Sequence, residues 1–143
     1  MCTRQLCVFI ENRKGRLAEV TRLLAAEKIN IRAMSLADMP DLGVLRLIVD
    51  DRTRCLRTLK DRGFAVQEAE VIAVEIQDEP GGLHRIIEAF DRDNINIEYM
   101  YTFFRKNVDT AIVVLKIDNV AQAIEAMKKN AIPVLPEDAI QNL

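Results

Sequence analysis

The chain has 143 residues, of which 50 % are hydrophobic and 29 % charged, and its formal net charge at pH 7 is −2. These proportions are typical of soluble globular proteins, and the small negative charge argues against a nucleic-acid-binding surface, which needs concentrated lysine and arginine. No apolar run is long enough to span a bilayer, no signal peptide is recognisable, and the three cysteines form no disulfide framework. We therefore expect a cytoplasmic protein with neither nucleic acid nor membrane as a partner.

The first half of the chain predicts a strand, a helix, two strands, a helix and a strand. Alternating apolar residues mark the strands, and apolar residues at helical spacing mark the helix faces that cover a sheet. In chain order these elements carry residues 5–11, 17–24, 29–31, 44–50, 55–59 and 64–68.

The second half repeats the same pattern. A shift of about 66 positions superposes Gly15 on Gly81 and Asn30 on Asn96, and the shift becomes about 68 beyond the middle of each copy. The corresponding elements carry residues 70–77, 83–90, 95–97, 110–117, 120–127 and 132–135.

The duplicated β-α-β-β-α-β order predicts an α+β protein made of two ferredoxin-like sandwiches, each with helices on one face of an antiparallel sheet. Right-handed crossovers place the first and third strands of each copy in the centre of its sheet. We expect one domain at residues 1–69 and a second at 70–143, with no flexible linker between them.

Side-chain positions within these elements can also be predicted. Asn12 and Asp78 are expected to cap the helices that follow them. Tyr99 and Tyr101 share the side-chain parity of core residues. The face of the second sheet that the helices leave open is expected to be apolar and covered by another surface, and its predicted residues are Ala73, Met100, Ile112 and Val114.

The segment from Ile10 to Leu17, followed after a helix by Ile29-Asn30-Ile31, resembles the ACT domain. The second copy, from Gln77 to Leu83 with 94–97, is closer still to that family's pattern. The resemblance implies a small regulatory module that binds free amino acids in the seam between two paired domains. It further implies that the first loop of one domain and the second strand of its neighbour grip the ligand.

The residues themselves agree with a site of this kind. A helix N-terminus offers unpaired backbone N–H groups to a carboxylate, and a glycine lets the backbone approach a ligand closely. Asparagine and aspartate oxygens could accept hydrogen bonds from an ammonium group. The candidate ligand-binding residues are Asn12, Arg13, Lys14, Gly15, Arg16, Leu17, Asn30, Ile31, Asp78, Gly81, Gly82, Leu83, Asn96 and Ile97.

Two pairings could form the ligand site. One joins the first loop to strand 96–100, and the other joins the second loop to strand 30–34. We expect the first pairing to be the better site. Lys14 stands where the family usually shows proline, and the acidic Asp78 and Glu79 distinguish the second loop. Asn30 and Asn96 could instead do no more than end an edge strand.

The function expected from these observations is that of a non-catalytic regulator or sensor for a free amino acid or similar small metabolite. We expect a homodimer, with a separate enzyme or regulator as a further partner, and neither a cofactor nor a metal. No Ser-His-Asp or Cys-His set can be assembled around the single histidine, which disfavours an enzyme. A structural dimer with vestigial sites, or an enzyme of unknown reaction, remains the alternative.

Overall fold

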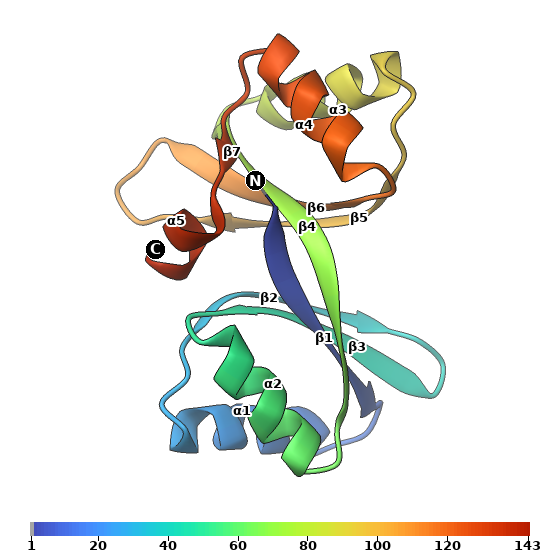
Figure 1. The fold of residues 1–143 in the computed structure, drawn as a ribbon, viewed down its shortest axis with the longest axis vertical. Coiled ribbons are helices and arrows are strands. Elements are labelled where there is room, and N and C mark those ends of the chain that lie inside the picture. The colour runs from blue at the N-terminus through green and yellow to red at the C-terminus, as the bar shows by residue number, and fades with distance from the viewer. Residues whose placement is uncertain (1) are drawn as a thin grey trace. The chain divides into compact units, whose positions relative to one another are not determined.

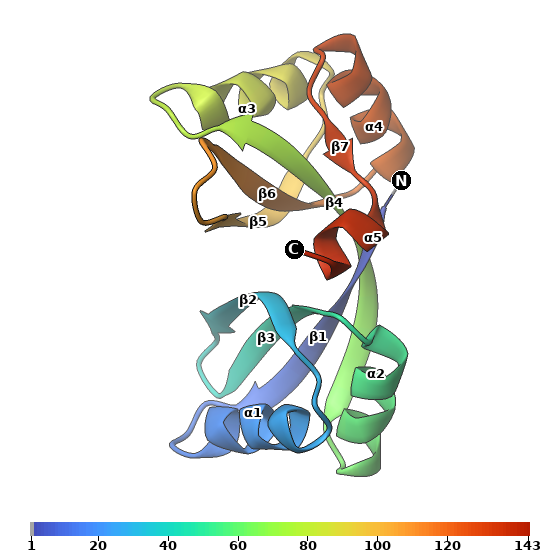
Figure 2. The ribbon, with the colours of Figure 1, turned by 90° about the vertical axis from the view of Figure 1, so that its left-hand side faces the viewer.

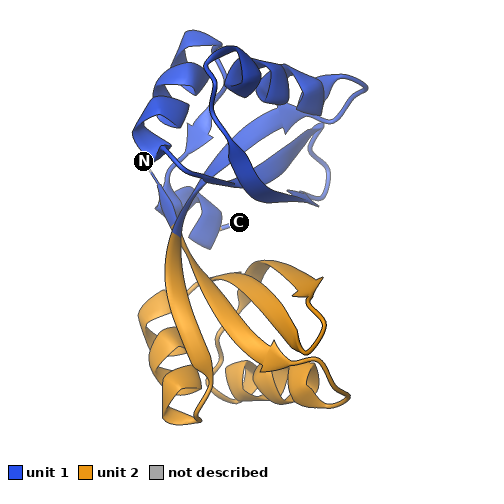
Figure 3. Ribbon diagram, turned by 90° about the vertical axis from the view of Figure 1, so that its right-hand side faces the viewer, with its two compact units in different colours: residues 1–3, 70–141, 143 blue, residues 4–69, 142 orange. Residues whose placement is uncertain are grey.

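The computed structural model describes residues 2–143 and divides into two compact units, shown in Figure 3. We call residues 4–69, together with 142, the N-terminal unit, and residues 2–3, 70–141 and 143 the C-terminal unit. Both units contain the same order of elements, and the two sandwiches predicted from the sequence are confirmed (Figure 1).

The N-terminal unit packs two helices on one face of an antiparallel sheet (Figure 1). Its strands lie in the order β2-β3-β1, followed by the first part of β4. The core contains Leu6, Val8 and Ile10, the three residues that alternate along the first strand. The elements are β1 (Thr3–Glu11), α1 (Arg16–Ala26), β2 (Ile31–Asp38), β3 (Leu42–Val49), α2 (Arg52–Asp61) and β4 (Ala65–Gln77).

The C-terminal unit repeats this arrangement around the second part of β4. Its strands lie in the order β7-β4-β6-β5, so the first and third strands of the copy are central, as predicted. Helices α3 and α4 cover one face of the sheet, and the short helix α5 lies on the opposite face (Figure 2). The further elements are α3 (Gly82–Arg92), β5 (Ile97–Phe104), β6 (Thr110–Ile117), α4 (Val120–Lys129), β7 (Val134–Leu135) and α5 (Glu137–Gln141).

Two features of the elements differ from the prediction. The strands expected at 64–68 and 70–77 form one continuous strand, β4, because no turn residue separates them. Helix α5 was not predicted, since its five residues offer only one buried apolar side chain, Ile140. No helix within residues 2–143 is both long and apolar enough to cross a bilayer.

The first helix of each unit begins differently from the prediction. The N-cap residues are Gly15 and Gly81, both with a left-handed backbone, and neither helix start has a side-chain cap. The prediction that Asn12 and Asp78 cap these helices was therefore wrong, because a bend and a turn separate each strand from its helix. Side-chain caps occur instead on the second helices, as at α2, where the Asp51 carboxylate accepts the Arg54 N–H at 3.1 Å.

A β-bulge near the start of β5 changes which side chains face the helices. The register with β6 shifts between Ile97 and Tyr99. As a result Met100 pairs with Leu115 and packs against the helix-side core. The same shift pairs Tyr101 with Val114, on the opposite face. The expectation that Met100 points away from the helices was wrong, and so was the parity inferred for the two tyrosines, because an added residue inverts the alternation.

The remaining residues predicted on the open face of the C-terminal sheet do point away from α3 and α4. Ala73, Ile112 and Val114 alternate with core residues along β4 and β6, and all three are fully buried. The face is therefore apolar and covered, as the sequence predicts.

Candidate functional site

A cleft of about 190 Å³ opens in the N-terminal unit, where β1 and β2 end and β3 begins. This volume lies below the range of about 300–1,000 Å³ that is usual for drug-sized ligands, so the cleft suits a small metabolite. Its lining residues are Ile10, Glu11, Asn12, Arg13, Leu17, Leu36, Ala37, Asp38 and Gly43.

The cleft is held open by the β2–β3 hairpin and by a glycine at the start of β3. Met39 and Leu42 close the hairpin through reciprocal backbone hydrogen bonds of 2.8 and 3.3 Å. Gly43 pairs with Ile10 on one side and Asp38 on the other. A Cβ at this position would lie 3.3 Å from Ile10 Cγ1 and 3.5 Å from the nearest methyl carbon of Leu36, so any side chain would narrow the cleft.

The lining combines opposite charges with an apolar wall. The Arg13 guanidinium donates to the Glu11 carboxylate at the rim, and both side chains are more than half exposed. Asp38 adds a second carboxylate from β2, while Leu17 and Leu36 supply apolar surface. Exposed ion pairs contribute only about 0–1 kcal/mol, so a charged ligand could replace the Glu11–Arg13 contact at little cost.

The other residues predicted in the first loop lie outside the cleft. Lys14 and Gly15 form the tip of the turn and are exposed. The Arg16 side chain turns back along the helix, where its guanidinium binds the Glu19 carboxylate at 2.6 Å and lies 4.9 Å from the centre of the Phe64 ring. Of the six predicted residues in this loop, Asn12, Arg13 and Leu17 line the cleft.

The predicted strand residues Asn30 and Ile31 lie at the opposite end of the same sheet. Ile31 pairs with Val49 at the end of β3, whereas the cleft adjoins its beginning. The Asn30 backbone is tied to Asp50 by hydrogen bonds of 2.9 and 3.1 Å. Within one unit, the first loop and the start of the second strand therefore cannot belong to the same site.

The second loop is built on the same plan in the C-terminal unit. Asp78 is exposed, and its backbone N–H donates to the Asp109 carbonyl at 3.0 Å. Gly81 is exposed, whereas Gly82 is buried and Leu83 packs on the core. The strand residues Asn96 and Ile97 lie at the far end of the sheet, where Ile97 pairs with Ile117 and Asn96 is exposed.

The residues that the β2–β3 hairpin adds to the cleft were not predicted from the sequence. Leu36, Ala37, Asp38 and Gly43 line it opposite the first loop. A lone glycine in a strand often marks a close backbone approach, and this signal at Gly43 could have been used.

Two features of the described residues concern metal binding and thiol reactivity. Within residues 2–143 no group of three histidine, cysteine or acidic side chains could hold a metal ion. Burial raises the pKa of the Cys55 thiol to about 12, with smaller contributions from Asp51 and Asp50, so this thiol stays protonated and unreactive at neutral pH.

The chain matches the family described as "ACT domain pair" over residues 1–143, and it belongs to that family. An ACT domain pair is a regulatory module of a type that binds small molecules. No curated protein matches the sequence.

Solved structures show the same fold. The crystal structure of protein BT0572 from Bacteroides thetaiotaomicron is 36 % identical, with a TM-score of 0.94, and the match covers 100 % of this chain and 98 % of that one. The regulatory subunit of aspartate kinase from Thermus thermophilus is 18 % identical, with a TM-score of 0.66 and coverage of 89 % and 91 %. Its counterpart from Thermus flavus is 15 % identical, with a TM-score of 0.62 and coverage of 92 % and 94 %.

Proposed function

We propose that the protein is a non-catalytic regulator that binds a free amino acid in the cleft of its N-terminal unit. The observation that carries this proposal is the composition of the cleft, in which an arginine, two carboxylates and an apolar wall surround a space of about 190 Å³. A zwitterion with a short side chain has matching groups for each of these features.

Each part of an amino acid has a partner in this arrangement. The α-carboxylate is bound by the Arg13 guanidinium and by the unpaired backbone N–H groups at the start of α1. The ammonium group donates to the carboxylates of Glu11 and Asp38. The side chain packs on Leu17 and Leu36. Inserting between Glu11 and Arg13, the ligand replaces one exposed ion pair by two.

In this proposal the strand of a neighbouring ACT unit, in the same chain or in a second copy, covers the ligand. Asn96 and Ile97 begin such a strand for the first loop, and Asn30 and Ile31 for the second. Residues 1–69 and 70–143 then act as the two ACT domains, and the ligand-bound protein is a cytoplasmic homodimer that transmits its state to a separate enzyme or regulator.

The neighbours are compatible with amino-acid control without fixing the ligand. Regulatory subunits of aspartate kinase share this fold at 15–18 % identity. The enzyme to which those subunits belong is named for an amino acid, and a role in controlling amino-acid metabolism suits the composition of the cleft.

The experiment is a thermal-unfolding panel of the purified full chain with each of the twenty common amino acids at millimolar concentration. At ten times the dissociation constant a ligand stabilises the folded state by about 1.4 kcal/mol. For a chain of this size that is a rise in melting temperature of about 3–6 °C. We expect one or a few amino acids to produce it.

Two variants assign the effect to the cleft. Arg13→Gln and Asp38→Asn should each reduce the shift, since each removes one of the charges that recognise a zwitterion. Lys128→Gln is the matched control, because it also removes an exposed cation from an ion pair, with Glu125 at 3.6 Å, but lies on α4 of the other unit. A full panel without any shift, or a shift that Arg13→Gln and Lys128→Gln reduce equally, would contradict the proposal.

A further inference from the structure

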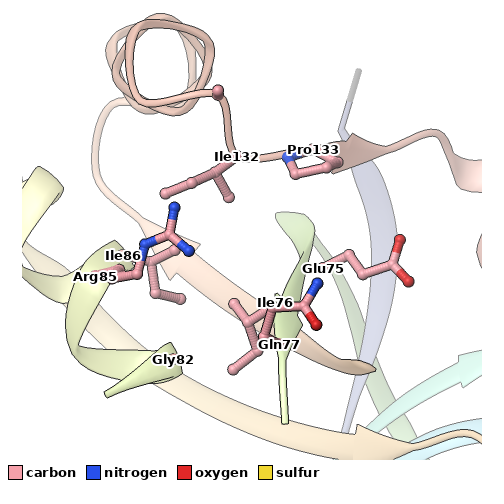
Figure 4. Close-up of a pocket in the computed structure, with 9 residues that line it drawn as sticks. Glu75, Ile76, Gln77, Gly82, Arg85, Ile86, Ile132 and Pro133 are labelled. Atoms are coloured by element: carbon pink, nitrogen blue, oxygen red, sulfur yellow. The ribbon is translucent and has the colours of Figure 1, made fainter. Parts of the chain in front are cut away.

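The C-terminal unit contains a second pocket that shares no residue with the cleft described above. It has a volume of about 210 Å³ and lies between the end of β4, the start of α3 and the segment that joins α4 to β7 (Figure 4). Figure 4 shows the Arg85 guanidinium extending between Ile86 and Ile132.

The pocket exists partly because β7 stops pairing with β4 at a proline. The Glu75 N–H donates to the Pro133 carbonyl at 3.1 Å, but proline has no N–H to return a bond. Gln77, two residues farther along β4, pairs with Thr110 of β6 but has no strand neighbour on the β7 side. Because the Asp78 N–H points to the other edge, toward Asp109, alternation directs the Gln77 N–H into the pocket.

At two positions that match the lining of this pocket, the N-terminal unit has larger side chains. Under the internal repeat, Gly82 matches Arg16 and Ile132 matches Phe64. In the N-terminal unit the Arg16 guanidinium lies 4.9 Å from the centre of the Phe64 ring, so these two side chains contact each other. The C-terminal unit has a glycine and a smaller side chain at these two positions, so less side-chain volume lines the pocket there.

The two units also carry opposite charges at one matching position of the first helix, Glu19 in the N-terminal unit and Arg85 in the C-terminal unit. In the N-terminal unit Glu19 binds the Arg16 guanidinium at 2.6 Å. Arg85 stands at the position that matches Glu19, and within residues 2–143 it has no ion pair. The one carboxylate that lines the pocket, Glu75, is bonded to Arg105 and, at 2.6 Å, to the Thr110 hydroxyl. The pocket therefore has an unpaired cation, Arg85, at the position where the N-terminal unit has the ion-paired anion Glu19.

We propose that this pocket binds a small organic carboxylate with a short apolar chain, at a second site that is independent of the amino-acid cleft. The carboxylate is bound by the Arg85 guanidinium and the Gln77 N–H, and the chain packs on Ile76 and Ile132. The negative charge of the ligand matches the unpaired Arg85 guanidinium, and its short chain suits the volume of the pocket.

The test is a titration of the ¹⁵N-labelled full chain with sodium butyrate, followed by amide chemical shifts. We expect saturable shifts at Gln77, at Gly82 to Ile86 and at Ile132. n-Butylamine hydrochloride, which has the same chain and the opposite charge, should not produce them. Sodium phosphate, which has no chain, should bind at least tenfold more weakly.

Three variants complete the design. Arg85→Gln, an exposed position that does not threaten folding, should weaken butyrate binding at least tenfold, and Ile132→Phe should do so because the larger side chain takes up volume in the pocket. Lys128→Gln, outside the pocket, should have no effect. The proposal is overturned if butyrate gives no saturable shift, if Arg85→Gln binds it as the parent does, or if butylamine or phosphate binds equally well.

Discussion

The turn into α3 contains two adjacent glycines that we expect to resist substitution for different reasons. A Cβ at Gly82 would lie 2.2 Å from the Gln77 carbonyl oxygen, which is a backbone atom. That oxygen also accepts the Glu79 N–H at 3.0 Å, so it cannot retreat without opening the turn. Overpacking costs about 1–3 kcal/mol, and a clash with fixed backbone places Gly82→Ala at the upper end, about 3 kcal/mol.

Gly81→Ala is the matched comparison. A Cβ at this position would meet no atom within 4 Å, but the residue has a φ of +85°. A left-handed backbone costs an ordinary residue about 1–2 kcal/mol, and Gly81→Asn should cost less because asparagine tolerates this region better. Urea unfolding of the three variants, followed by circular dichroism, measures the differences. If Gly82→Ala lowers the unfolding midpoint no more than Gly81→Ala, the contact with the Gln77 carbonyl oxygen is not what limits position 82.

The remaining predictions concern the cleft, the caps and the buried thiol. Gly43→Ala should leave the melting temperature nearly unchanged but weaken amino-acid binding about tenfold, or about 1.4 kcal/mol, because the added methyl group enters the cleft between Ile10 and Leu36. Calorimetric titration measures the affinity. An unchanged affinity would mean that the ligand binds elsewhere. Asp51→Ala should cost about 1 kcal/mol of unfolding free energy, whereas Asn12→Ala should cost less than about 0.5 kcal/mol; equal losses would restore Asn12 as a cap. The pKa of Cys55 is raised from 9.0 to about 12 in the folded protein. The contribution of the protonated thiol to the free energy of unfolding is therefore complete below pH 9.0 and is lost as the pH rises toward 12. Denaturant melts between pH 8 and pH 11 should show this loss in the parent and not in Cys55→Ala; parallel curves would contradict it.

Most of the fold could be predicted because its signals are local. The alternation of Leu6, Val8 and Ile10 identifies a half-buried strand directly, and the internal repeat doubles the weight of each such pattern. Helix ends were also predictable, since the polar pairs Glu27-Lys28 and Asp93-Asn94 occur at matching places in the two copies. In the structure the helices end just before these pairs, and Lys28 and Asn94 both have a φ of 55°.

The rest depended on features with no local signal. The bulge that reverses Met100 and Tyr101 involves ordinary residues, and only cross-strand pairing reveals it. The cleft was half predicted, because loop residues such as Arg13 follow a recognisable motif. Asp38 lines the cleft only because the β2–β3 hairpin brings it there. The Arg16 guanidinium lies outside the cleft, where it packs on the ring of Phe64, a residue distant in sequence.

The proposed function requires that a free amino acid occupies the cleft at the end of β1. The most direct measurement is a crystal structure of the full chain grown with the amino acid that gives the largest thermal shift. We expect density for one amino acid with its carboxylate on Arg13 and its ammonium group on Glu11 or Asp38. An empty cleft in crystals that hold the same amino acid elsewhere on the protein would contradict it.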